Sequence, residues 1–352
     1  MRKDFKIEQW IQFLHIVQFP RDVGIIYNDV FTRRKVLNIN SYINTIERNK
    51  RRDVYVSLFS DIQIHEGMFD KVYIDIDGGI KEANRTMQTL VKKIEEKYDV
   101  KPLVLCSGVH GYHIYTYYPL VNIEGWLTIR EWVLRLCDEI CSELLKKYND
   151  DMRKVEREFN MLYVDTQVVG DISRVVRPPY TINHKANKGY VVPIDVDMSV
   201  DDIKKRVKYP EEVEIYIEVS KKIRDELVEI NKEVKRRLKK SIVVEVNSDK
   251  LVEELELLLK VANRVRDGRK RMLSFLIIPR LLWLGYTPEE TEAWCKAWVE
   301  ETGAEYRRYA SLVRSMIRRT IRGSQEGEMW RPWSFRTFFY ENPELLDEVG
   351  EK

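Results

Sequence analysis

The stretch Lys71–Asp77, KVYIDID, decides the fold of the first half of the chain. Apolar side chains alternate there with Tyr73, Asp75 and Asp77, and this two-residue period predicts a β-strand. The alternation puts Asp75 and Asp77 on one face at the strand's end, before Gly78. The sequence offers these two carboxylates no obvious local cation. A divalent ion such as Mg²⁺ or Mn²⁺ would relieve their repulsion, although two acids in a solvent-facing turn are the alternative.

The composition indicates a globular chain of two domains or one large domain, with 352 residues of which 44% are hydrophobic. Charged residues make up 33%, a balance typical of heat-adapted proteins. Because the net charge is only +3, a nucleic-acid partner would have to be bound by local basic clusters.

Cysteine usage and hydropathy bear on the compartment. The four cysteines form no CxxC pair, and Cys137 and Cys141 have helical spacing, so we expect buried thiols rather than a metal site. The charged N-terminus lacks the apolar core of a signal peptide. No apolar run approaches the roughly 20 residues that span a bilayer. These features predict a soluble, cytoplasmic protein with no membrane partner.

Strands and helices alternate over the first 200 residues, which predicts an α+β fold with a mixed sheet. Further strands are expected at 53–60, 102–108 and 112–120 with one or two within 21–39, and helices at 5–19, 40–50, 82–100, 127–148 and 151–160. Later segments predict a long charged helix at 211–240, a weak strand at 241–246, and a bundle of short helices broken at Gly268, Gly285 and Gly303. The expected division is a mixed domain at 1–209, a connector at 210–249 and an all-α bundle at 250–352.

A glycine-containing turn, SGVHGYH (107–113), lies between two apolar strands. Glycine lets a backbone approach a phosphate closely, and Ser107 and His113 would donate hydrogen bonds to it. A hairpin with incidental histidines is the alternative. A zinc site at His110 and His113 lacks partner cysteines or carboxylates.

Two more features follow. Asp165 ends the apolar segment MLYVD, where an ordinary strand-end aspartate is the alternative. Arg174 and Arg177 then precede a Pro-Pro turn that leads to Lys185, and arginine forks suit triphosphate oxygens. Surface salt bridges are the alternative for these basic residues.

Taken in order, DxD, SGxxGxH, hydrophobic-Asp and R-x-P-x-T-x-N-x-K resemble the motifs of the archaeo-eukaryotic primase superfamily. The resemblance covers roughly residues 20–200 and implies an RRM-like catalytic core. Its last motif begins about twelve residues after the third aspartate, which favours Asp165 over its competitor Asp171 for that role. The ending T-x-N-x-K looks like the primase-polymerases of archaeal plasmids, viruses and phages. Val109 and His110 stand where replicative primases have two arginines, and Asn183 stands where they have a histidine.

The resemblance implies two-metal nucleotidyl transfer, with two Mg²⁺ or Mn²⁺ ions and no structural zinc or iron-sulfur cluster. It assigns metal binding and catalysis to Asp75, Asp77 and Asp165. It assigns nucleotide binding to Ser107, Gly108, His110, His113, Arg174, Arg177, Asn183 and Lys185, and also to Arg33. The expected partners are a single-stranded DNA template, dNTPs or NTPs, and in some settings a helicase. The expected role is primer synthesis and extension in replication of a plasmid, virus or mobile element.

The C-terminal region looks like the helical domains fused to plasmid primase-polymerases. We expect it to bind template DNA and the initiating nucleotide through Arg266, Arg269, Lys270, Arg271, Arg314 and Arg318, with a plain solvated face as the alternative. Trp330, Trp333, Phe335, Phe338 and Phe339 would either stack on bases or pack in the core. Two other functions stay open: a repair or end-joining polymerase of the same superfamily, and a non-catalytic origin-binding initiator.

Overall fold

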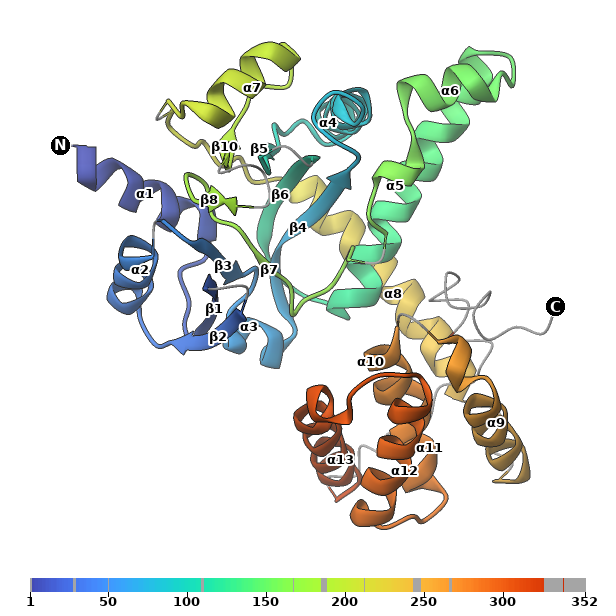
Figure 1. Cartoon of the computed structure of the whole chain (residues 1–352). Coiled ribbons are helices and arrows are strands. Elements are labelled where there is room, and N and C mark those ends of the chain that lie inside the picture. Colours follow the sequence, from blue (N-terminus) through green and yellow to red (C-terminus); the bar gives the residue numbers. More distant parts are fainter. Residues whose placement is uncertain are drawn as a thin grey trace. The chain divides into compact units, whose positions relative to one another are not determined.

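The computed structural model describes residues 2–27, 30–49, 51–108, 111–166, 168–184, 189–211, 213–242, 248–265, 268–325 and Phe338. Contacts divide the chain into two compact units, residues 1–234 and 235–352. The first unit is mixed α+β and the second is helical, which confirms the predicted fold class (Figure 1). The division falls inside one long helix, α8 (Lys221–Ile242), within the segment that the sequence marks as a connector.

The first unit holds two β-sheets. The six-stranded sheet has the order β2-β1-β3-β8-β9, with β7 also on β3, and the four-stranded sheet has the order β10-β5-β6-β4. The strands of the first sheet are β1 (Arg21–Tyr27), β2 (Val30–Val36), β3 (Asp53–Ser57), β7 (Val175–Val176), β8 (Ile182–Asn183) and β9 (Gly189–Tyr190). Those of the second are β4 (Met68–Asp77), β5 (Leu103–Cys106), β6 (Gly111–Asn122) and β10 (Val192–Pro193). Only the β3–β8 pair among them is parallel.

The predicted strand at 71–77 forms the C-terminal part of β4, and both of its faces are buried as far as Ile76, including Tyr73 and Asp75. Val72, Ile74 and Ile76 are fully buried, as expected for the face that carries the apolar side chains. β4 pairs with β6 in antiparallel register, and helices α4 (Asn84–Tyr98) and α5 (Gly125–Lys147) contact this sheet.

The other helices of this unit are α1 (Arg2–Leu14), α2 (Ile39–Arg48), α3 (Asp61–Glu66), α6 (Met152–Glu158) and α7 (Val200–Lys208). In Figure 1, α1 and α2 lie beside the six-stranded sheet. Capping boxes start α2 at Asn38 and α3 at Ser60, so local side-chain hydrogen bonds fix where these helices begin.

The apolar segment before Asp165 contains a 3₁₀ helix, Met161–Tyr163, in which the Asn160 side chain accepts a hydrogen bond from the Leu162 amide, and Val164 bridges to β4. One sequence-based expectation is wrong in detail. The helix predicted at 211–240 begins only at Lys221. The described residues before it form no helix; Val219 bridges to Tyr117, and the Ile215 amide donates to the side chain of Gln9.

The second unit is built from α9 (Ser248–Lys260), α10 (Arg269–Arg271), a π-helical turn (Met272–Ile277), α11 (Ile278–Trp283), α12 (Pro288–Glu301) and α13 (Ala310–Gln325), with 3₁₀ turns at Ala262–Arg264 and Tyr306–Arg308. The predicted breaks at Gly268, Gly285 and Gly303 are confirmed, since all three have positive φ. Residues 243–247, where the weak strand was expected, lie outside the described residues.

Cys106, Cys137 and Cys295 are buried free thiols and Cys141 is half-buried, so the expectation of core thiols is confirmed for three of the four. Among the helices in the described ranges, none combines the length and the apolar character needed to cross a bilayer.

Candidate active site

Asp75 and Asp77 stand at the end of β4, next to β6. The antiparallel register sets Asp75 opposite His113 and Asp77 opposite Gly111. Asp75 is buried and Asp77 is exposed, so the pair runs from the interior of the sheet to its edge. A Cβ at Gly111 would lie 1.8 Å from the carbonyl oxygen of Ile76, so this close pairing of the two strands requires glycine.

Asp165 joins this pair through the backbone. Val164 bridges to Ile76, and the amide of Asp165 donates a 3.0 Å hydrogen bond to the carbonyl of Asp75. Its competitor Asp171 instead accepts from the amide and hydroxyl of Ser173, at 2.9 and 2.7 Å, and so shapes its own loop. The structure therefore brings Asp165, which is 90 residues distant in sequence, to the two strand acids.

The acids influence one another electrostatically. The pKa of Asp77 is raised, first by burial and then by the negative charges of Asp75 and Asp165. Burial also raises the pKa of Asp75, against the opposing positive charge of Arg174. The sequence near the DxD acids offers no cation, but the fold brings a distant one to Asp75, because Nη2 of Arg174 lies 3.3 Å from its Oδ2.

His113 faces Asp75 across the strand pair, with Nε2 at 3.5 Å from Oδ1. Its pKa is lowered to about 3, by burial and by the positive charges of Arg177 and Arg174, so the imidazole is neutral at physiological pH. Nδ1 is buried and finds no hydrogen-bond partner among the described residues. A neutral imidazole at this place can donate one hydrogen bond and accept another.

The turn between β5 and β6 is closed by hydrogen bonds from its first residue, Ser107. The amide and the hydroxyl of Ser107 both donate to the carbonyl of Gly111, at 3.0 and 3.2 Å. The side-chain amide of Asn183 donates to the carbonyl of Ser107 at 2.6 Å. Gly108 has a φ of 112°, which favours glycine. Val109 and His110 lie outside the described residues.

The two arginines of the fourth motif are drawn to different acids. Arg174 binds Asp75, while Arg177 binds Asp53 on β3 through Nη2 at 3.1 Å and Nε at 3.3 Å. The guanidinium of Arg177 also lies over the ring of Tyr55, 4.4 Å from its centroid, and donates to its hydroxyl. With only 12% of its side chain exposed, Arg177 is held in a pocket rather than spread on the surface.

Three residues that sequence reasoning missed complete this arrangement. Asp53, which is 4% exposed, binds Arg177 and also the backbone amide and Nδ1 of His184, at 3.1 and 2.8 Å. Tyr55 packs on Arg177 from the same face of β3. An available signal was the alternation of DVYVS, which puts the acid and the tyrosine on one face of a strand otherwise made of valines and serine.

Arg33 lies at the margin of this arrangement. Its Nε donates to Asp22 at 2.8 Å and its Nη2 to the carbonyl of Ser173 at 3.3 Å, so it touches the loop that carries Arg174 rather than the strand acids. Lys185, the last residue of the fourth motif, lies outside the described residues.

In the second unit, several predicted DNA contacts already have protein partners. Arg269 donates to the hydroxyl and carbonyl of Thr302, and Arg314 binds Glu292 at 2.8 Å. Lys270 and Arg318 are exposed and Arg271 is half-buried. Arg266 lies outside the described residues.

The predicted stacking aromatics have one described member. Phe338 is fully buried in the core of the second unit, which supports the core alternative for that residue. Trp330, Trp333, Phe335 and Phe339 lie outside the described residues.

The donor set at the β4 edge fits a hard divalent cation in chemistry, because it consists of carboxylates that repel one another. As the side chains are placed, no three His, Cys, Asp or Glu residues within the described ranges form a cluster that could hold a metal ion. Asp75 instead pairs with Arg174 and His113.

Neither a protein-family model nor a curated protein matches this sequence. Among solved structures, the chain is similar to the catalytic domain of primase RepB' in complex with initiator DNA, with 11% identity, 66% of this chain and 96% of that chain covered, and a TM-score of 0.38. It is similar to primase RepB' with 16% identity, 97% of both chains covered and a TM-score of 0.33. It is also similar to the polymerase domain of Mycobacterium tuberculosis Ligase D in complex with DNA, with 12% identity, 59% and 88% covered, and a TM-score of 0.35.

Proposed function

We propose that this chain is a template-directed nucleotidyltransferase, a DNA primase-polymerase that makes and extends primers on single-stranded DNA. The observation that carries the proposal is the meeting of four distant segments in one place. The acids of β4, Asp165, His113 and the two motif arginines come from residues 75 to 177 and from both sheets of the first unit, and they lie near one another around the end of β4. Acids flanked by cationic groups suit a reaction on a polyphosphate.

Asp75, Asp77 and Asp165 would hold the divalent ions, Mg²⁺ or Mn²⁺. When bound, such ions activate the attacking hydroxyl and stabilise the pyrophosphate that leaves. Arg174, whose Nη2 lies 3.3 Å from Oδ2 of Asp75 and whose side chain is 35% exposed, would contact the phosphates of the nucleotide from beside these ions.

The remaining side chains would position the triphosphate. Arg177 is fixed by Asp53 through Nε and Nη2. A guanidinium with a preset orientation loses less entropy when it binds a phosphate. His184 is exposed, and its Nδ1 is held by Asp53, so Nε2 is the ring nitrogen left for a ligand. We add His184 to the nucleotide contacts proposed for Ser107, Gly108, His113 and Asn183.

The finer assignment rests on the motif resemblance. It includes replication of a plasmid, virus or mobile element, use of dNTPs or NTPs, cooperation with a helicase, and template or initiating-nucleotide binding by the second unit. In that unit, Thr287 and Glu290 form the capping box that starts α12. Among the described residues proposed there, Lys270, Arg314 and Arg318 are exposed, and Arg314 is paired with Glu292.

The decisive experiment is a template-only assay with the full chain, Mn²⁺ or Mg²⁺, and labelled dNTPs or NTPs in turn. A primase-polymerase produces new labelled strands without a primer. A repair or end-joining polymerase extends only a supplied primer or annealed end. An origin-binding initiator binds DNA and incorporates nothing, and that outcome would end the enzymatic proposal.

A further inference from the structure

The edge strand β2 and helix α2 carry a surface that the acidic site does not use. All side chains from Val30 to Lys35 are exposed, although they belong to a strand. Among the described strands, β2 pairs only with β1 and so forms the edge of its sheet. The exposed residues combine an aromatic ring with basic groups, the combination that single-stranded nucleic acid requires.

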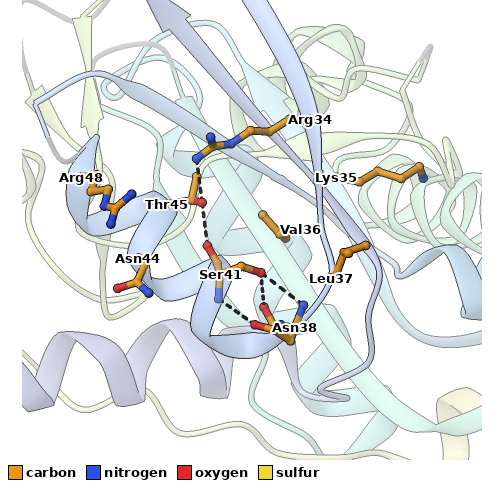
Figure 2. A pocket seen from close by; sticks show the side chains of 9 residues that line it. All are labelled: Arg34, Lys35, Val36, Leu37, Asn38, Ser41, Asn44, Thr45 and Arg48. Carbon is orange, nitrogen blue, oxygen red and sulfur yellow. Dashed lines mark hydrogen bonds between the residues drawn. The ribbon is translucent and has the colours of Figure 1, made fainter.

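An open pocket of about 440 Å³ lies between the end of β2 and α2. Its lining is polar and basic, with no acidic residue: Arg34, Lys35, Val36, Leu37, Asn38, Ser41, Asn44, Thr45 and Arg48. Figure 2 shows Arg34 reaching toward Thr45, and Asn44 and Arg48 projecting from α2, while Lys35 extends away from the helix. Such a lining favours an anionic ligand.

The basic side chains of this pocket differ in the partners that they already have. Lys35 is paired with Asp61 and lies 3.7 Å from Asp22, so its charge is compensated. Within the part of the chain that the structure describes, the side chain of Arg34 bonds only a neutral hydroxyl, Oγ1 of Thr45 at 2.8 Å, and the guanidinium of Arg48 makes no hydrogen bond or ion pair. Two exposed guanidinium groups thus flank the pocket without a carboxylate partner.

On the opposite face of β2, Phe31 forms an aromatic shelf. Phe31 is 47% exposed, and its ring packs edge-on against the ring of Tyr55, with the two ring centroids 5.7 Å apart. The ring lies across Gly24 of β1, where an added Cβ would come within 2.5 Å of two ring atoms. Tyr55 in turn carries Arg177 on its face, so the shelf leads directly to the candidate active site.

We propose that this surface binds a single nucleic-acid strand, with a phosphodiester in the Arg34–Arg48 pocket and a base on Phe31. The inference rests on the proposed function, since it gives the template or primer strand a path beside the active site. The ring of Phe31 can stack on a nucleobase, which either a nucleic-acid strand or a free nucleotide can supply. The shelf is assigned to the strand because Phe31 and Arg34 lie three residues apart on the same edge strand, on its two faces, and Arg48 lines the pocket from α2, so a chain that passes around this edge can contact all three.

The test measures binding of a labelled single-stranded oligonucleotide by fluorescence anisotropy, in EDTA and without nucleotide, over a series of salt concentrations. Arg34→Ala/Arg48→Ala should weaken binding and reduce the slope of log K against log salt by about 0.7, since the pocket holds one phosphodiester and each phosphate contact contributes about 0.7. The matched control is Arg153→Ala/Arg157→Ala, which removes two exposed arginines from α6. If the two pairs behave alike, the pocket is not a phosphate site.

The aromatic arm uses three substitutions. Phe31→Ala should weaken binding roughly 5- to 100-fold with an unchanged salt slope, and Phe31→Trp should restore it. Gly24→Ala should resemble Phe31→Ala, because the new methyl group displaces the ring. Thermal unfolding of each variant confirms that the fold is intact.

The outcomes separate this proposal from the proposed function. If Phe31→Ala raises the KM for nucleotide and leaves strand binding unchanged, the shelf serves the incoming nucleotide and the strand assignment is wrong. If wild type fails to bind the oligonucleotide at all, the proposed function fails as well. If wild type binds and primes while every variant of this surface behaves as wild type, only the inference fails.

Discussion

The carboxylate of Asp53 holds the guanidinium of Arg177, with Oδ1 accepting from Nη2 at 3.1 Å and from Nε at 3.3 Å. The acid is buried and 124 residues distant in sequence from the arginine. The same carboxylate binds His184, so one side chain of β3 orients two groups at the proposed phosphate site.

Replacing Asp53 with Asn should therefore impair nucleotide binding more than the chemical step. Asn retains the volume and removes the charge, and charge-assisted hydrogen bonds contribute about 1.5–3 kcal/mol each. We expect the KM for nucleotide to rise roughly 10-fold or more, with a smaller change in kcat. The control Asp61→Asn breaks an exposed ion pair with Lys35 and should change KM less than 2-fold. A KM unchanged in Asp53→Asn would remove the positioning role.

The metal-binding assignment separates Asp165 from Asp171. Titration of the protein with Mn²⁺, followed by the paramagnetic resonance of the free ion, should show weaker binding in Asp165→Asn than in wild type. Asp171→Asn should bind Mn²⁺ like wild type, because that carboxylate is turned to Ser173. The reverse order would transfer the third-acid role to Asp171. This readout needs no enzymatic activity.

Gly111 tests the strand pairing that positions His113 against Asp75. Gly111→Ala places a methyl carbon 1.8 Å from the Ile76 carbonyl oxygen. The backbone of the two strands must move to relieve this clash. We expect a loss of at least about 3 kcal/mol in unfolding free energy, at the upper end for single substitutions. Gly303→Ala, with φ +75° and open space around it, should lose only about 1–2 kcal/mol. Equal losses in denaturant unfolding would contradict the close approach.

Lys71 gives the fold a dependence on alkaline pH. It is buried against Asp70, and burial lowers its pKa from 10.5 to about 8. Between these two values the unfolded chain binds more protons at this lysine than the folded chain does. The contribution of Lys71 to unfolding free energy therefore rises with pH from about 8 toward 10.5. Denaturant unfolding should show wild type gaining stability relative to Lys71→Met over pH 8–10. A difference that stays constant or shrinks would contradict the lowered pKa.

Local patterns were enough to predict part of this structure. The two-residue period of KVYIDID gives the strand and the shared face of its acids, and glycines mark the helix breaks of the second unit. The order of the motifs indicated Asp165, and its backbone amide does donate a hydrogen bond to Asp75 of β4. The 3₁₀ turn before Asp165 was not predicted, because it involves a side-chain hydrogen bond at Asn160 that apolar periodicity does not indicate.

The rest of the candidate site depends on contacts between segments that are far apart in the sequence. Asp53 and His184 are 131 residues apart, and their contact depends on the parallel pairing of β3 with β8, which no local pattern encodes. The bond between Arg174 and Asp75 likewise crosses 99 residues. Such partners become visible only after the two sheets are assembled.

The central claim is that the acids at the end of β4 carry out nucleotidyl transfer, and Asp77→Asn tests it most directly. Asp77 is exposed at the strand's end, so the substitution should leave the fold intact. Primer extension with Mn²⁺ and labelled nucleotides is measured for this variant, for wild type and for Asp171→Asn. We expect Asp77→Asn to lose at least about 1,000-fold in rate, near 4 kcal/mol of transition-state stabilisation, while Asp171→Asn stays active. Extension by Asp77→Asn at near the wild-type rate would contradict the account.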